Sequence, residues 1–95
     1  MSKQDLSSLR IPPHSLESEQ AVLGALMLRP QALHEIDDLI TPEMFYARKH
    51  ATIYQTMLEL SMKSEPIDVL SVASKLKEKK QINEIGGNPY LNELM

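Results

Sequence analysis

Cysteine and tryptophan are absent from this 95-residue sequence, and the aromatic residues are one phenylalanine and three tyrosines. Without cysteine the chain can form neither a disulfide framework nor a thiolate metal site. This fits a reducing compartment, and the cytoplasm is our expectation. Because aromatic residues are so few, the core must be built from Leu, Ile, Val, Met and Ala, a set that favours helices over a sheet.

Long hydrophobic runs are also missing. Nowhere do about 18 apolar residues follow one another, and residues 1–13 lack the uninterrupted apolar stretch of a signal peptide. We therefore expect no association with membranes. Ten Lys and Arg residues against thirteen Asp and Glu residues give a net charge of −3. That sign is unfavourable for gripping a phosphate backbone, so little direct binding of nucleic acid is expected.

The sequence has only three glycines, and none belongs to a Gly-x-x-x-x-Gly-Lys-Ser/Thr segment. The pair Gly86-Gly87 is followed by Asn88-Pro89 rather than by lysine. We therefore expect no ATPase activity, and the chain is not predicted to be an enzyme. The sequence gives no grounds to assign any catalytic, cofactor-binding or metal-ligating residue.

Hydrophobic residues make up 42% and charged residues 24% of the chain, as in an ordinary globular protein. Residues 1–13 show no sustained period and end in Pro12-Pro13, which predicts a flexible N-terminal arm. Residues 14–95 are predicted to form one all-α domain, a compact bundle of about five or six short helices joined by loops of about 2 to 6 residues.

In the first half of that domain, Ser15 is the expected N-cap of a helix that carries Glu17 and Glu19 in its first turn. Gly24 inside this helix indicates that another backbone or a bulky side chain packs close to it. After a break at Arg29-Pro30, a short surface helix is expected over Gln31–Ile40.

Thr41-Pro42-Glu43 then predicts a short turn or helix, capped by Thr41, that docks Met44 and Phe45 into the core.

In the second half, an uninterrupted helical period predicts a central helix from about Arg48 to Lys63. Asp68 is the expected cap of the next helix, whose inward stripe consists of Val69, Val72, Ala73 and Leu76. A turn over Ile82–Ile85 and a stop at Gly86-Gly87 precede a last helix. Asn88 should cap that helix, and Pro89 should be its first residue.

Several polar groups invite a functional interpretation. His34, Glu35, Asp37 and Asp38 have helical spacing that could meet a divalent cation, but a solvated helix face is the commoner use of such residues. His14 and His50 are expected to be packing, capping or surface residues rather than catalytic bases, because no Ser, Cys or metal arrangement surrounds them.

The lysines near residue 80 suggest either a nucleic-acid patch or cations placed at the negative end of a helix dipole; they are Lys75, Lys77, Lys79 and Lys80. The segment from Pro89 to Met95 has no Lys or Arg with which to read bases, which favours the second interpretation.

Phenylalanine and tyrosine residues are predicted to lie in the core: Phe45, Tyr46, Tyr54 and Tyr90. Core filling is also the expected main use of the methionines: Met1, Met27, Met44, Met57, Met62 and Met95.

The stretch from Pro12 to Gly24, Pro-Pro-His-Ser-Leu-Glu-Ser-Glu-Gln-Ala-Val-Leu-Gly, resembles the N-terminal domain of bacterial replicative DNA helicases of the DnaB family. Three further segments follow in the order expected for that domain: Phe45-Tyr46 with His50 and Ile53, then Glu65-Pro66-Ile67-Asp68, then Gly86-Gly87 leading into Tyr90-Leu91. Four short patterns in order, with matching helical phase, are specific together. The resemblance runs from about Ile11 to Met95.

This resemblance implies a collar domain of a ring-shaped hexameric helicase. In that family N-terminal domains associate pairwise into a trimer of dimers, stabilise the ring and help to recruit primase during DNA replication, with a helicase loader as a further candidate partner. ATP and magnesium are expected only for the parent protein, whose RecA-like motor domain unwinds duplex DNA and lies outside this chain.

Two departures from the family pattern affect these expectations. The helical hairpin that normally follows the domain is not included, so the isolated chain should associate weakly. Where relatives place glycine before Pro-Ile-Asp, this chain has Lys63-Ser64. A left-handed residue there costs about 1 kcal/mol, so a local difference in the turn is expected.

A stand-alone helical DNA-binding regulator is the alternative function, and a small metal-dependent enzyme is a third.

Overall fold

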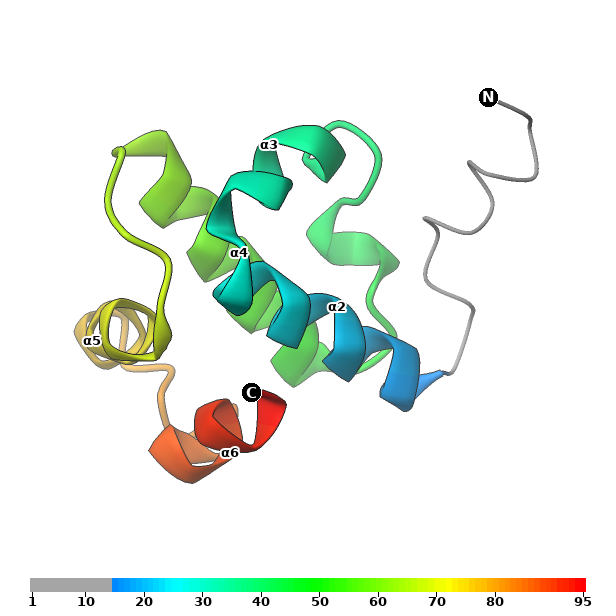
Figure 1. Ribbon diagram of the computed structural model, residues 1–95. Coiled ribbons are helices and arrows are strands. Elements are labelled where there is room, and N and C mark those ends of the chain that lie inside the picture. Colours follow the sequence, from blue (N-terminus) through cyan, green and yellow to red (C-terminus); the bar gives the residue numbers. More distant parts are fainter. Residues whose placement is uncertain (1–14) are drawn as a thin grey trace.

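The computed structural model describes residues 15–95, which form five α-helices and two 3₁₀ helices (Figure 1). In chain order they are α2 (Leu16–Leu28), η1 (Pro30–Ala32), α3 (Leu33–Ile36), η2 (Pro42–Met44), α4 (Arg48–Met62), α5 (Val69–Glu78) and α6 (Gly87–Leu94). No strand occurs within residues 15–95, which confirms the all-α class. The predicted arm and His14 lie outside the described residues.

The central position belongs to α4, as its uninterrupted helical period predicts. Helices α2, η2 and α5 all pack against it, and α6 packs against α2 and α5 (Figure 1). Leu23 of α2 is fully buried, and in α5 Val72, Ala73 and Leu76 are buried while Val69 is partly buried. The predicted inward stripe of α5 is therefore confirmed, with Val69 at its margin. Between residues 15 and 95, no helix has both the length and the apolar character needed to cross a bilayer.

Two helix starts follow the predicted chemistry. The Ser15 hydroxyl accepts a hydrogen bond from the Ser18 amide at 3.3 Å and caps α2. The Asp68 carboxylate accepts one from the Ser71 amide at 2.7 Å and caps α5. Both side chains satisfy amides that have no partner within their own helix.

Gly24 lies where α2 and α6 meet. A Cβ atom at this position would lie 2.2 Å from the carbonyl oxygen of Leu94. The predicted close approach at Gly24 is therefore confirmed, and the neighbour is the backbone of the last helix.

The ends of α4 and α5 share one geometry, although neither has glycine. Ser64 and Lys80 each follow a helix in the left-handed conformation, with φ of 56° and 60°. At the end of α4 the Glu65 amide donates to the Leu60 carbonyl at 2.9 Å, which is the longer bond of a Schellman motif. The turn before Pro-Ile-Asp therefore has a serine in the left-handed conformation.

Two predicted boundaries and one predicted cap are wrong. The helix expected over Gln31–Ile40 is divided into η1, α3 and a turn, and the chain is extended at Thr41, the residue before Pro42. The Thr41 side chain makes no capping hydrogen bond. The last helix begins at Gly87 rather than Pro89, because Gly86 adopts φ of 100° and starts the helix without a side-chain cap.

Candidate functional site

The residues considered for a metal site do not converge. His34, Glu35, Asp37 and Asp38 are all exposed on or just after α3. Across residues 15–95, no group of three or more His, Cys, Asp or Glu side chains is arranged to hold a metal ion. These residues form a solvated surface of the short helix.

The lysines of α5 are partly engaged by acidic neighbours. The Lys79 Nζ atom lies 3.0 Å from Glu59 Oε1 and 3.0 Å from the Thr56 hydroxyl, both on α4. Lys75 contacts Glu78 at 3.5 Å within α5. Burial raises the pKa of Glu59, but its hydrogen bonds and the nearby lysine charges outweigh burial and hold that pKa below its ordinary value. This face is therefore a mixed-charge surface rather than a uniformly basic one.

The aromatic and methionine predictions hold only in part. Phe45, Tyr54 and Tyr90 are buried as predicted, whereas Tyr46 is 62% exposed and does not belong to the core. Met27 and Met57 are buried, but three methionines at or near helix ends are exposed and do not fill the core: Met44, Met62 and Met95. Met1 lies outside the described residues.

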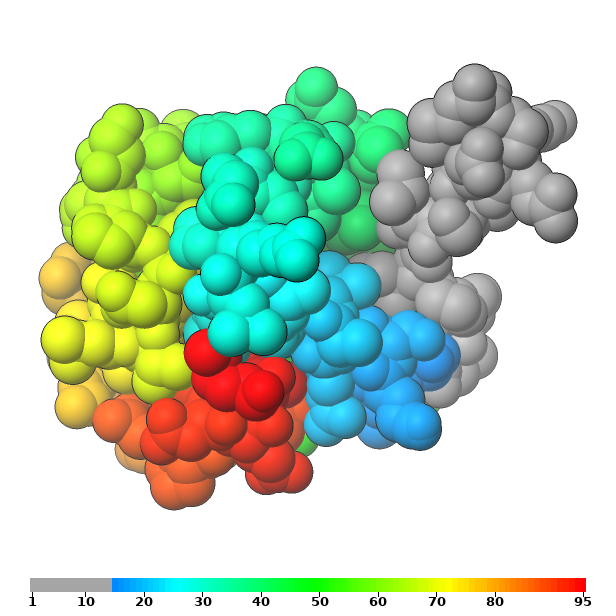
Figure 2. Space-filling model, in the orientation of Figure 1, coloured from blue at the N-terminus to red at the C-terminus, as the bar shows by residue number. Residues whose placement is uncertain are grey.

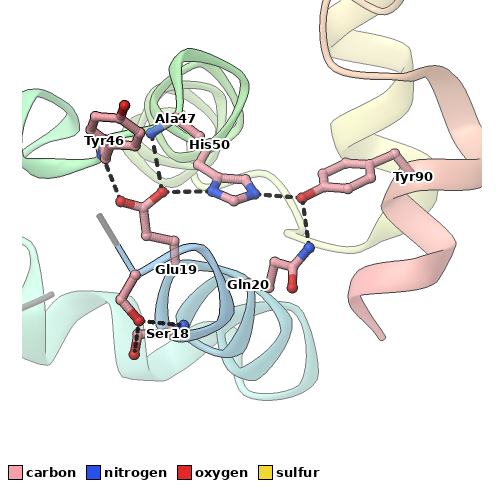
Figure 3. A network of polar contacts seen from close by, with 8 residues as sticks. Ser18, Glu19, Gln20, Tyr46, Ala47, His50 and Tyr90 are labelled. Atoms are coloured by element: carbon pink, nitrogen blue, oxygen red, sulfur yellow. Dashed lines mark hydrogen bonds and ion pairs between the residues drawn. The ribbon is translucent and has the colours of Figure 1, made fainter. Parts of the chain in front are cut away.

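The main polar feature of the interior is a chain of side chains that joins α2, α4 and α6 (Figure 3). It starts at Glu19, whose carboxylate is fully buried. One carboxylate oxygen accepts from the Tyr46 amide at 2.6 Å, and the other accepts from the Ala47 amide at 3.2 Å. Ala47 is the N-cap of α4 and has no polar side chain, and Glu19 on α2 accepts the amide hydrogens of this residue and of the residue before it. The carboxylate therefore lies at the N-terminal end of α4, where the helix dipole favours negative charge.

His50, in the first turn of α4, continues the chain. Its Nδ1 atom lies 2.7 Å from Glu19 Oε1, and its Nε2 atom lies 2.5 Å from the Tyr90 hydroxyl. The Gln20 side-chain amide donates to the same hydroxyl at 3.2 Å. His50 is fully buried and Tyr90 is 8% exposed, so these bonds form away from bulk water.

One proton arrangement satisfies all these groups. A neutral His50 with its hydrogen on Nδ1 donates to the Glu19 carboxylate and accepts the Tyr90 hydroxyl hydrogen at Nε2. The Tyr90 oxygen then accepts from Gln20. The single negative charge of Glu19 faces three N–H donors, which is how proteins retain a buried carboxylate.

Rings and a cation enclose this chain of residues. The Phe45 ring lies edge-on to the His50 imidazole, with 6.5 Å between the ring centroids. The Lys49 Nζ atom lies 3.9 Å from the centroid of the Tyr90 ring, a cation–π distance. A carboxylate, an imidazole and a hydroxyl in series are also the components of acid–base catalysis, but here they are buried against one another. We therefore interpret the Glu19–His50–Tyr90 network, with Gln20, as a connection between three helices.

Sequence reasoning placed Glu19 in a first turn near the helix dipole and missed its partners. One signal could have indicated its burial. Glu19 lies four residues before Leu23 and seven before Leu26, on the apolar face of α2.

The outer surface carries several exposed apolar side chains at helix ends. Leu28 is 65% exposed at the end of α2, Met62 is 85% exposed at the end of α4, and Leu70 is 77% exposed in the first turn of α5. Figure 2 shows the end of α6 against the segment that follows α2, so the exposed ends of these two helices are neighbours. A protein that covered these side chains would gain hydrophobic free energy on binding.

The sequence is similar to known proteins over most of its length. The family model of the DnaB-like helicase N terminal domain matches residues 11–95, the range that the four sequence segments predict. The chain is 46% identical over 90 residues to the replicative DNA helicase DnaB of Geobacillus stearothermophilus and 41% identical over 90 residues to the replicative DNA helicase DnaC of Bacillus subtilis (strain 168). Both alignments cover 95% of this chain and 20% of the relative, so the chain spans about a fifth of their length.

The fold is similar to a solved structure as well. The crystal structure of the N-terminal domain of DnaB helicase from Mycobacterium tuberculosis matches it with a TM-score of 0.82 and 36% sequence identity. The match covers 88% of this chain and 58% of that chain. Sequence and fold therefore point to the same family.

Proposed function

This chain belongs to the family of DnaB-like helicase N-terminal domains, and on that premise we propose that it is an assembly domain in the collar of a hexameric replicative DNA helicase. In this proposal, ATP, magnesium and strand separation belong to the motor of the longer protein. The chain itself contributes contacts between neighbouring subunits and a surface for primase and a helicase loader.

One observation carries the proposal: large apolar side chains are exposed at the helix ends, while the polar groups of the Glu19–His50–Tyr90 network are satisfied internally. A domain of this kind has little reactive chemistry to offer a substrate, and it gains free energy when another protein covers its apolar side chains. The net charge of −3 and the acidic partners of Lys75 and Lys79 favour a protein partner over a nucleic acid.

The first experiment measures self-association. Sedimentation equilibrium of the chain should show weak, reversible formation of dimers, because an isolated domain buries only part of the interface of a ring. The variants Leu28→Glu, Met62→Glu and Leu70→Glu each add one charge at a different helix end. At least one should reduce association, whereas the matched control Gln55→Glu, at an exposed polar position, should not. A chain that stays monomeric at about 1 mM, where interactions of about −4 kcal/mol are detected, would contradict self-association.

The second experiment tests the alternative function. Fluorescence anisotropy with labelled duplex and single-stranded DNA should show only weak binding at low salt, and this binding should disappear as the salt concentration rises. Tight binding with a steep salt dependence would instead favour a DNA-binding regulator. Titration of isotope-labelled chain with bacterial primase, followed by NMR, then addresses the primase contact directly.

A further inference from the structure

The last helix, α6, is joined to the rest of the fold differently from the helices before it. Gly86 precedes it and Gly87 is its first residue, and both have positive φ, 100° and 75°. These are conformations that glycine adopts without steric cost. No side chain caps the start of α6, whereas Ser15 and Asp68 cap α2 and α5. Two adjacent glycines at a helix start without a side-chain cap form a backbone segment that can change conformation at little steric cost.

The buried face of α6 provides apolar packing. Leu91 is fully buried, and Leu94 is 9% exposed. The Leu94 carbonyl fits against Gly24, where there is no room for even one additional carbon atom. Close van der Waals packing against α2 thus holds α6 in place, and this attraction weakens quickly when the two helices separate.

The only side-chain hydrogen bonds that α6 makes within residues 15–95 belong to Tyr90. Its hydroxyl reaches His50 on α4 and Gln20 on α2, as Figure 3 shows. Through His50 the hydroxyl is linked to Glu19 and hence to the start of α4. One phenolic group therefore connects the last helix to the polar interior of the domain.

We propose that α6 is a hinged helix that Tyr90 latches to the Glu19–His50 pair, and that it opens as a unit about Gly86-Gly87 when the latch is released. Opening exposes Leu91, Leu94 and the Gly24 surface of α2, while α2 and α5 stay packed on α4. Segments of this kind, with few ties to the core, open with a lower free energy than the whole domain. The proposal concerns motion within the chain and does not depend on the role in helicase assembly.

Native-state hydrogen exchange of the full chain tests the latch. Tyr90→Phe keeps the ring and removes the hydroxyl, so the amides of α6 should exchange about five to ten times faster, as expected for one lost buried hydrogen bond. The amides of α4 should keep their rates. The matched control is Tyr54→Phe, which removes the buried hydroxyl that donates to the Ile40 carbonyl at 2.7 Å and does not touch α6.

The two tyrosine variants distinguish a latch from general stabilisation. Tyr54→Phe should leave the ratio of α6 to α4 exchange rates unchanged. The proposal is overturned if Tyr90→Phe accelerates α4 and α6 equally, or if it leaves the exchange of α6 unaltered.

A second variant disturbs the packing between α6 and α2 and leaves the Tyr90 hydroxyl in place. Gly24→Ala places a methyl group 2.2 Å from the Leu94 carbonyl oxygen and should force α6 outward. We expect the α6 amides to lose most of their protection and the NMR signals of His50 to shift, while α2, α4 and α5 remain protected. If the amides of all helices lost their protection from hydrogen exchange together, α6 would not open independently, and the proposed hinge would be wrong.

Discussion

The two ends of α4 are held by different kinds of interaction. Its N-terminal end is fixed by the buried Glu19 carboxylate, which receives bonds from residues 27 to 31 positions away along the chain. Its C-terminal half is held by apolar packing against α5 and by the partly exposed Glu59–Lys79 pair. Because Glu19 is buried, loss of its hydrogen bonds should reduce the stability of the fold. The apolar packing between α4 and α5 follows a helical period, so it can be recognised in the sequence. Variants at each end can measure this difference.

The largest effect is expected in the apolar half, from Leu76→Asp. Leu76 is fully buried in the hydrophobic core, and the substitution places a carboxylate among apolar side chains that cannot form hydrogen bonds or ion pairs with it. We expect the variant to lose its cooperative unfolding transition, as measured by circular dichroism during heating. Leu23→Asp on α2 should behave in the same way, because Leu23 is also fully buried.

The matched control is Leu70→Asp. Leu70 lies on the same helix, and its side chain is 77% exposed. The same substitution there should change the unfolding free energy by no more than about 0.5 kcal/mol. If Leu70→Asp unfolded the chain as Leu76→Asp does, the two faces of α5 would be wrongly assigned.

The second largest effect is expected at the polar end, from Glu19→Ala. This change leaves the Tyr46 and Ala47 amides and His50 without their acceptor. A buried donor left without its acceptor costs about 1–3 kcal/mol, and urea denaturation can measure the loss. Glu17→Ala is the control, since Glu17 lies in the same first turn but is exposed. Its effect should stay below about 1 kcal/mol. Equal losses for both variants would mean that Glu19 contributes only through the helix dipole.

These two helix ends also mark what the sequence could predict. The stripe of α5 and its Asp68 cap were predictable because they follow a helical period and a local capping rule. The bonds of Glu19 were not, because they join residues far apart in sequence, and no local pattern specifies such partners. Of the network, sequence reasoning indicated only that Tyr90 is buried and that His50 has a packing, capping or surface role.

Exposed residues show a second limit. Tyr46 and Met62 are residue types that usually lie in a protein core, yet both are exposed. Their hydrophobicity predicted burial, but whether a residue at a helix end faces the core depends on the face of the helix on which it lies. Met62, for example, lies seven residues after the exposed Gln55, on the outward face of α4. Sequence similarity was enough to assign the family, whereas the Glu19–His50–Tyr90 network could be found only from the structure.

The third prediction concerns alkaline pH and the middle of α4. Burial, together with the charge of Asp37, raises the pKa of Tyr54 to about 12. The unfolded chain ionises this tyrosine near pH 10, so its stabilising contribution is complete below that pH and is lost as the pH rises towards 12. Tyr54→Phe should therefore cost about 1 kcal/mol at pH 8, and the gap from the unmodified chain should narrow between pH 10 and 12.

Urea denaturation at several pH values measures this gap. Tyr46→Phe, which removes the hydroxyl of a largely exposed tyrosine, is measured beside it. A constant gap between the unmodified chain and Tyr54→Phe up to pH 12 would contradict the raised pKa.

The smallest effect is expected where α4 meets α5 at the surface, from Glu59→Gln. Glu59 and Lys79 lie 3.0 Å apart, but their side chains are 32% and 23% exposed, so water and salt screen the pair. We expect a loss of about 0.2–1 kcal/mol at pH 7 that shrinks when salt is added. Since the pKa of Glu59 is lowered in the folded state, this contribution is present above about pH 4.3 and disappears as the pH falls through the folded value. A loss as large as that of Glu19→Ala would mean that the two ends of α4 rely equally on charge, and the contrast between them would fail.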